Sequence, residues 1–316
     1  MHTAHLFVTL QFIILTIGMR KLLYISLWAI ACGLVGSCNG TEGDAAADDS
    51  TALRVGVLPT MECLPFYYAD SMGVFDSVGL DVTLVTFEAA MDADTAFANG
   101  LVDGVATDLV KACVWNGQGD SVRVAIGADL QLWFVASPGV ELRGTDALKE
   151  KIVGITRHSA VDFFADKVLE MEKLESLDLN KPQINNLWTR MQMVLQKQYD
   201  GAVLPEPYAM WATAKGAERL WSIEELGVKG MMCVVFGDSV YRAREVEMEK
   251  LRMAYGMAAE ALNADTTEDK LAFLPLQQTS VPDSLYRDVV FKPSVMPSDS
   301  MMQVVREWAQ GRGLIE

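Results

Sequence analysis

The sequence predicts an α/β fold of two lobes. Short β-branched segments alternate with helical segments from residue 53 onward, a pattern typical of a largely parallel sheet. The alternation restarts near residue 132, and the folded part is long for a single core. We therefore expect lobe 1 to comprise residues 53–131 and 238–316, and lobe 2 to comprise residues 132–237.

A signal sequence is expected before the folded part. The apolar run Leu22–Leu34 follows Arg20 and Lys21 and leads into small residues. A basic start, a short apolar middle and a small-residue exit are typical of a secretory signal, and the run is shorter than the ~20 residues of a membrane span. We expect residues 1–37 to be this signal, with Met19 as a possible true start.

The end of the signal, "LVGSC", resembles a bacterial lipoprotein signal, in which cleavage before the cysteine leaves that cysteine lipidated. Val35 stands where this class usually has leucine. The resemblance implies that Cys38 carries a lipid that holds the protein at a membrane surface. Residues 38–52 are small and acidic, so we expect a lipidated N-terminus and a flexible tether. The alternatives are an ordinary signal peptide or an apolar helix that contains Cys38.

Lobe 1 begins with four predicted strands and three predicted helices. The strands are β-branched runs bounded by glycine, proline or acidic residues, namely "ALRVGVLP", "LDVTLVTFE", "VDGVATD" and "SVRVAIGAD". The first helix starts near Leu64 and ends before Gly73. The other two helices are "MDADTAFANG", with acidic residues at its front and glycine at its end, and "LVKACVWNG".

Lobe 2 repeats the pattern. Its predicted strands are "LWFVAS", "KIVGIT", "QINNLW", the strand that opens "AVLPEPYAMWATAKG", and "MMCVVFGD". Its predicted helices are "AVDFFADKVLEMEKL", which has apolar residues at helical spacing, "TRMQMVLQKQYDG" and "YAMWATAK". The long helix "REVEMEKLRMAYGMAAEALNAD" then returns the chain to lobe 1.

Composition argues against several functions. The formal net charge of −16 repels nucleic acid and favours solubility. Cys63, Cys113 and Cys233 are far apart in the sequence, and His158 is the only histidine after Cys38, which gives no recognisable zinc site or redox pair. No G-x-S-x-G, P-loop or G-x-G-x-x-G follows a suitable strand. We expect no catalytic residues, no cofactor and no metal.

Four motifs in order carry a resemblance across residues 53–316. They are "FYYADSMGVF", "FANGLVDGVATD", "TDALKEKIVGIT" and "YDGAVLPEPYA". The chain resembles type II periplasmic solute-binding proteins, and more narrowly the nitrate, sulfonate and thiamine-precursor branch that serves ABC transporters. It departs from this branch at Lys149-Glu150-Lys151, where a leucine–glycine–lysine turn is usual, and at Thr156-Arg157-His158-Ser159, which lacks a glycine.

The resemblance implies a monomeric, lipid-anchored binding protein of the cell envelope. It would capture a small solute in the interlobe cleft and deliver it to an ABC permease and its ATPase. Two alternatives stay open. One is an enzyme on the same fold, similar to menaquinone-pathway enzymes, although the signal and the missing cysteine-rich motif of enzymatic relatives argue against it. The other is a surface lipoprotein that senses or scavenges without a permease.

The candidate ligand residues follow from where the strands end. Ligands of open α/β sheets lie beyond the carboxyl ends of strands, where loops meet. Aromatic side chains supply flat contact, and hydroxyl and carboxyl groups supply hydrogen bonds. The candidates are Thr60, Glu62, Asp92, Thr107, Asp108, Trp133, His158, Ser159 and Glu206.

Several carboxylates in one cleft repel anions, so an amine- or pyrimidine-like solute is favoured over sulfonate or nitrate. The competing interpretation is helix capping. Glu62, Asp92 and Asp108 also stand where helices begin, and a carboxylate there satisfies free N–H groups. Glu206, between two prolines at a strand end, favours ligand contact or a hinge over a cap.

Overall fold

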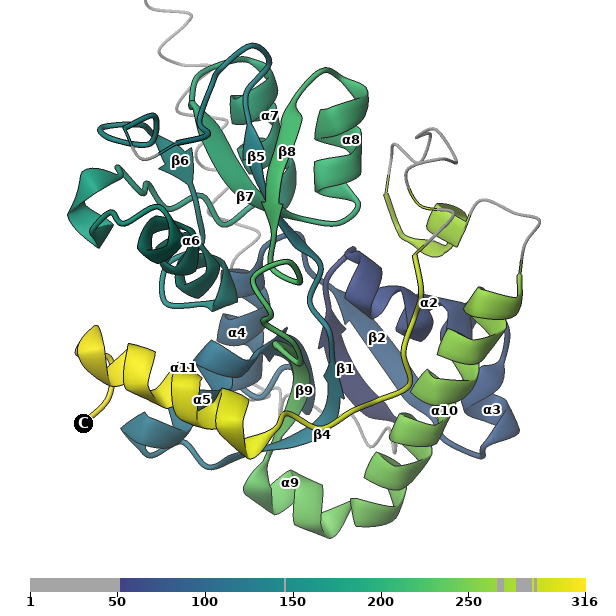
Figure 1. Ribbon diagram of the computed structural model, residues 1–316. Coiled ribbons are helices and arrows are strands. Elements are labelled where there is room, and N and C mark those ends of the chain that lie inside the picture. The colour runs from purple at the N-terminus through teal and green to yellow at the C-terminus, as the bar shows by residue number, and fades with distance from the viewer. Residues whose placement is uncertain (1–51, 145, 266–269, 277–285, 287–288) are drawn as a thin grey trace, which may run out of the picture. The chain divides into compact units, whose positions relative to one another are not determined.

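Two β-sheets, each packed against helices, organise the protein (Figure 1). The computed structural model describes residues 52–316 except 145, 266–269, 277–285 and 287–288, and these residues belong to one compact unit. The N-terminal signal, Cys38 and the tether therefore lie outside the described residues. Within the described part, no helix combines the length and the apolarity that crossing a membrane requires.

The first sheet has five strands in the order β2-β1-β3-β9-β4. Strand β1 runs parallel to β2 and β3, whereas β9 runs antiparallel to β3 and β4. The bounds are β1 (Leu53–Val57), β2 (Val82–Thr86), β3 (Gly104–Asp108), β4 (Val122–Ala128) and β9 (Met232–Gly237).

The second sheet has four strands in the order β6-β7-β5-β8. Strands β6 and β7 are parallel, and β5 is antiparallel to both β7 and β8. The bounds are β5 (Leu132–Ala136), β6 (Val153–Gly154), β7 (Gly201–Pro205) and β8 (Glu218–Ser222). Segments 129–131 and 223–231 connect the two sheets.

The expectation of a largely parallel sheet holds for the direction of β1, β2, β3 and β4, which run the same way, but β9 is reversed, and the two connections explain why. Strands β1, β3 and β4 all run toward the second sheet, because β4 leads directly into segment 129–131. The chain returns through segment 223–231, so β9 enters the first sheet from that end and must run the other way. Strand β9 lies within residues 132–237 yet pairs in the first sheet, so the expected lobe boundary at residue 237 does not follow the sheets.

Helices cover the first sheet on both faces. Alternate residues of β9 point to opposite sides, since Met232, Val234 and Phe236 join the core that contains α2 and α10, while Cys233 and Val235 join the core that contains α4 and α5. The bounds here are α2 (Leu64–Ser71), α3 (Val74–Ser77), α4 (Ala90–Ala98), α5 (Leu109–Gln118), α9 (Asp238–Ala243) and α10 (Glu245–Ala264).

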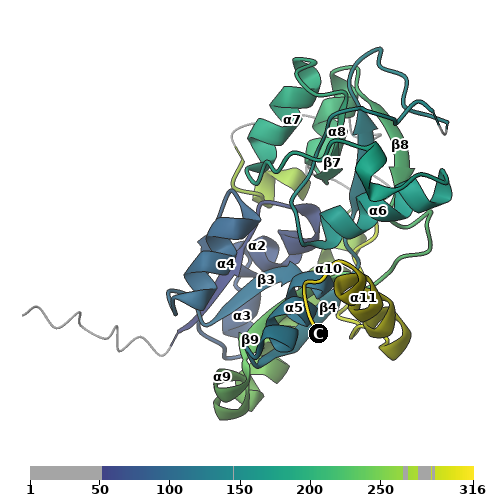
Figure 2. The same ribbon diagram turned by 90° about the vertical axis from the view of Figure 1, so that its left-hand side faces the viewer.

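The second sheet carries α6 (Ala160–Met171), α7 (Leu187–Leu195) and α8 (Tyr208–Ala214), and the chain ends in α11 (Asp299–Gly311). Figures 1 and 2 both place α11 beside α5 and below α6. Short 3₁₀ turns lie at η1 (Met61–Cys63), η2 (Ser176–Asp178) and η3 (Lys270–Phe273).

Most predicted elements are confirmed. The segment "QINNLW" is not a strand, because Gln183 makes only an isolated bridge to Ile155 and helix α7 starts at Leu187. Strand β8 and helix α11 were not predicted. Strand β8 has a charged, half-polar sequence, "ERLWS", and its pairing with β5 gives it extended structure.

Candidate functional site

Polar side chains from the two sheets face a common pocket of about 70 Å³. Thr60 and Glu62 follow β1, and Thr107 and Asp108 end β3. From the second sheet, Thr156 and Ser159 follow β6, and Arg190 comes from α7. The pocket forms here because β1 and β3 of one sheet and β6 and β7 of the other end against each other, as ligand sites of α/β sheets do.

Glu62 is the buried acid of the pocket. Its side chain lies on η1, and the residue is 7 % exposed. Burial raises the pKa of Glu62 to about 7, with the nearby charge of Glu206 adding to the effect and the Thr60 hydroxyl opposing it. Glu62 Oε2, Thr60 Oγ1 and Thr107 Oγ1 have no hydrogen-bond partner of normal geometry in the described part of the chain. Buried polar atoms in proteins are nearly always paired, so these three are positioned for a partner that the chain does not supply.

Asp108 serves a helix and the pocket at once. Lys111 N donates to Asp108 Oδ1 at 3.1 Å, which caps α5. The backbone N–H of Ala160, the first residue of α6 on the second sheet, also hydrogen-bonds the carboxylate and favours its charged form. Burial nevertheless raises the pKa of Asp108 to about 7. The carboxylate therefore faces helix N-termini of both lobes.

Arg190 is the pocket residue that the sequence interpretation missed. Its side chain is fully buried, and burial lowers its pKa to about 9. Nε donates to Ile184 O at 2.8 Å, Nη1 donates to Val203 O at 2.9 Å, and Nη2 donates to Thr156 Oγ1 and to Ile184 O. No carboxylate among the residues that the structure describes forms an ion pair with it.

A signal for Arg190 was present in the sequence. Leu187, Arg190, Met191 and Val194 are spaced as one helix face, and all four are buried in α7. An arginine on an otherwise apolar helix face indicates either that the buried face has been placed wrongly or that the arginine is buried and hydrogen-bonded to nearby polar groups. Here it is the second, because Arg190 ties the loop before α7 to strand β7.

Ser159 belongs to the pocket, whereas His158 and Asp92 lie outside it. Ser159 Oγ accepts from Val161 N at 3.2 Å, which caps α6, and donates to Thr156 O at 2.7 Å. His158 lines a neighbouring hollow of about 300 Å³ that shares Thr156 with the pocket. Asp92 is exposed in the first turn of α4, and its side chain makes no cap hydrogen bond.

Glu206 and Trp133 lie at a third hollow, of about 450 Å³, beside the segments that connect the sheets. Glu206 Oε1 lies 2.6 Å from Arg219 Nη2, and Glu206 Oε2 accepts from Met210 N at 2.9 Å in the first turn of α8. The Arg219 guanidinium lies 4.7 Å from the centre of the Trp133 ring. These contacts give Glu206 the geometry of a helix cap and an ion-pair partner.

The described residues contain no group of three or more histidine, cysteine, aspartate or glutamate side chains arranged to hold a metal ion. The cysteines Cys63, Cys113 and Cys233 are free. Burial raises the pKa of the Cys63 thiol to about 12, so this cysteine at the edge of the pocket is protonated at neutral pH and a poor nucleophile.

Residues 46–131 match the model of the NMT1-like family. No curated protein matches the chain. The fold is similar to that of the ligand-binding component of an ABC-type import system from Staphylococcus aureus, solved with zinc bound. That likeness has 12 % identity and a TM-score of 0.70, and it covers 84 % of this chain and 92 % of that one.

Two further similar structures are sulfonate-binding proteins. The alkanesulfonate-binding protein SsuA from Xanthomonas axonopodis pv. citri, bound to MOPS, has 17 % identity and a TM-score of 0.71, with 84 % of this chain and 94 % of that one covered. The periplasmic aliphatic sulphonate binding protein SsuA from Escherichia coli has 16 % identity and a TM-score of 0.67, with 84 % and 93 % covered. At these identities the likeness shows the fold, and it confirms the expected two-lobed, periplasmic-binding-protein-like α/β architecture.

Proposed function

We propose that this protein is the substrate-binding component of an ABC-type importer and captures a small organic solute between its lobes. One observation carries the proposal: among the described residues, a carboxyl oxygen of Glu62 and the hydroxyls of Thr60 and Thr107 are buried at the pocket without a hydrogen-bond partner of normal geometry. Leaving such groups unpaired costs about 1–3 kcal/mol each, and a bound solute offsets that cost. The similar solved structures, which are binding components of importers, support this role.

The chemistry of the pocket favours an amine- or pyrimidine-like solute. Glu62 has a pKa near 7, so it can accept from an N–H group as a carboxylate or share a proton with a ring nitrogen. An aminopyrimidine presents an N–H donor next to a ring nitrogen acceptor. A protonated carboxyl group matches this pair, because its C=O oxygen accepts from the N–H and its O–H donates to the ring nitrogen. The pocket of about 70 Å³ has room for several water molecules, at roughly 10–15 Å³ each, and so for one small ring.

Arg190 favours a second candidate, a small anion such as a sulfonate or nitrate. A buried guanidinium without a carboxylate partner attracts negative charge. However, Ile184 O, Val203 O and Thr156 Oγ1 already occupy most of its five N–H donors. Arg190 is therefore less available to a ligand than the unpartnered Glu62 is.

A thermal-shift experiment on the purified full chain separates these candidates. We expect 4-aminopyrimidine to raise Tm and methanesulfonate and nitrate to leave it unchanged, since a ligand at 100 times its Kd stabilises the folded state by about 2.7 kcal/mol. Glu62→Gln should abolish the shift, whereas Asp92→Asn, an exposed carboxyl-to-amide control, should keep it. A shift with the anions alone would contradict the proposed ligand class, and no shift with any small solute would contradict the binding role.

The remaining parts of the proposal concern location and partners. We propose that Cys38 is lipidated and anchors the protein in the cell envelope, where it acts as a monomer and delivers solute to a permease and its ATPase. The net charge of −16 supports a partner other than nucleic acid. We propose no catalytic role. Permease and ATPase genes beside this one would favour import over a sensing or scavenging role.

A further inference from the structure

The last helix, α11, connects parts of the molecule that belong to different sheets. It follows a strap, residues 289–298, that runs along the edge strand β4. Val295 N donates to Gly127 O at 2.8 Å, and Gly127 N donates to Ser294 Oγ at 3.2 Å. A Cβ atom at Gly127 would lie 2.2 Å from Val295 O, so glycine is what allows the strap to approach this closely. The strap is therefore fastened to the first sheet.

Helix α11 itself packs on α5, also on the first sheet. Val305 is fully buried in one hydrophobic cluster with Leu109 and Val110 of α5. Beyond the helix, Ile315 lies against Gly117, where an added Cβ would come within 2.4 Å of its side chain. One face of α11 and the chain end after it are thus held by lobe 1.

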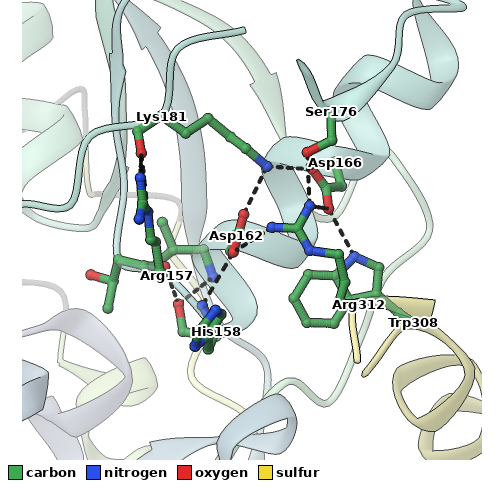
Figure 3. A network of polar contacts seen from close by, with 11 residues as sticks. Arg157, His158, Asp162, Asp166, Ser176, Lys181, Trp308 and Arg312 are labelled. Carbon is green, nitrogen blue, oxygen red and sulfur yellow. Dashed lines mark hydrogen bonds and ion pairs between the residues drawn. The ribbon is translucent and has the colours of Figure 1, made fainter. Parts of the chain in front are cut away.

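The same apolar stripe of α11 also contacts α6 of the second lobe, because Val305, Trp308 and Arg312 follow one another at helical spacing (Figure 3). Trp308 Nε1 donates to Asp166 Oδ2 at 3.0 Å, and the Trp308 ring packs edge-on against Phe163 at 5.7 Å. Arg312 lies 3.3 Å from Asp162 Oδ2 and 3.4 Å from Asp166 Oδ2. Asp162 is fully buried, so removal of a partner would leave its carboxyl oxygens under-satisfied.

Lys181 completes the cluster from the second lobe itself. Its Nζ lies 2.9 Å from Asp162 Oδ1 and 2.5 Å from Asp166 Oδ1. The carboxylates of Asp162 and Asp166 on α6 therefore each contact two cations. One is Lys181 of the second lobe and the other is Arg312 of α11. Arg312 supplies the only charge contact of this cluster that crosses between lobes among the described residues.

The same cluster reaches the ligand pocket. Asp162 Oδ2, the oxygen that faces Arg312, also accepts from His158 N at 3.2 Å. His158 belongs to the loop 156–159, whose residues Thr156 and Ser159 line the pocket. Asp162 thus fixes both the pocket loop and the contact with α11.

We propose that α11 is an interlobe latch, in which Trp308 and Arg312 hold α6 and the pocket loop 156–159 in the closed arrangement. Rotation of the lobes about segments 129–131 and 223–231 would separate α6 from α11 or strip α11 from α5. Opening therefore breaks this cluster, and the latch sets how often the pocket opens in the absence of solute.

Hydrogen exchange of the full chain without ligand tests the latch, measured by mass spectrometry on peptides that cover residues 156–171. We expect Arg312→Gln to speed exchange there by about tenfold, and Trp308→Phe, which keeps the ring and removes the N–H donor, by about threefold. Exchange in β1 and α10 should stay within about twofold of the wild type. Because no solute is added, the result is independent of the proposed ligand.

Arg306→Gln is the matched control. Arg306 lies on the same helix but contacts Cys113 of α5, so it touches the first lobe only. This variant should leave exchange in residues 156–171 unchanged. Unchanged exchange in both latch variants, or faster exchange across the whole chain including β1 and α10, would overturn the proposal.

Discussion

At the scale of single residues, the pocket is defined by ionisable groups placed where water is largely excluded. Burial raises the pKa of Glu62 and of Asp108 to about 7 each and lowers that of Arg190 to about 9. In each case desolvation is the largest cause, because a charged form loses more than a neutral form on leaving water. Folding around such groups costs stability, and under the proposed function a bound solute would offset that cost.

Glu62 makes stability depend on pH in a defined direction. Between its ordinary pKa of 4.5 and its folded pKa of about 7, the folded protein keeps a proton that the unfolded chain releases. This contribution is fully present below pH 4.5 and is lost as pH rises through 7. Glu62→Gln removes the cost of the charge, so we expect the variant to match the wild type near pH 4.5 and to exceed its free energy of unfolding by up to about 3 kcal/mol at pH 8.

Urea unfolding at pH 5, 6, 7 and 8 measures this difference. Asp92→Asn serves as the control, since it makes the same carboxyl-to-amide change on an exposed side chain outside the pocket. Asp108 and Glu206 remain in both proteins, so the difference between the two profiles reports Glu62 together with its interaction with Glu206. Parallel pH profiles for Glu62→Gln and wild type would contradict the assignment of Glu62 as a buried acid.

At the scale of elements, caps and strand ends decide which polar side chains are structural. Side chains of Asp108, Ser159, Asn186 and Ser298 each accept from a backbone N–H in the first turn of α5, α6, α7 and α11. Two of them, Asp108 and Ser159, also line the pocket, so capping and ligand contact are compatible roles. A residue that the sequence marks as either a helix cap or a ligand contact can therefore be both.

Glu206 holds α8 to its neighbouring strand. Its side chain accepts from Met210 N in the first turn of α8 and pairs with Arg219 on β8, and it is not among the residues that line the 70 Å³ pocket. We expect Glu206→Gln to lower the free energy of unfolding by about 1–3 kcal/mol, because Arg219 is left half-buried without its counter-charge. Binding of 4-aminopyrimidine should persist in the same variant.

Urea unfolding and thermal shift of the same preparation test this pair of outcomes. Glu218→Gln, an exposed neighbour on β8 that lies 3.8 Å from Arg143, is the matched control and should change neither quantity. Retained stability with lost binding would instead support the ligand role that the sequence favours for Glu206.

At the scale of the whole molecule, the proposed lipid anchor makes location a property of the N-terminal segment. The lipoprotein interpretation predicts that Cys38→Ser moves the protein from the membrane fraction to the soluble fraction, because the acyl chains are what hold it there. Fractionation followed by immunoblotting measures this. Cys113→Ser, a change at a half-buried cysteine of α5, is the control and should keep the wild-type distribution. A Cys38→Ser protein that stays in the membrane fraction would refute lipid anchoring.

The two sheets and the two connections between them set how the molecule works. Strand ends of both sheets meet at the pocket, and segments 129–131 and 223–231 are the covalent links about which the lobes can rotate. Helix α11 adds a non-covalent link through Arg312 and Asp162. If both proposals hold, solute binding and the latch act on the same equilibrium between open and closed forms.

The sequence by itself determined the α/β class, the alternation of elements and the loops from which Thr60, Glu62, Thr107, Asp108 and Ser159 reach the pocket. It did so because hydrophobic period, caps and turn residues are local signals. Only the tertiary structure decided that β9 joins the first sheet, that Glu206 pairs with Arg219, and that Arg190 is buried at the pocket. These features depend on partners far away in the chain, and strand direction, burial and ion pairing are properties of the assembled fold.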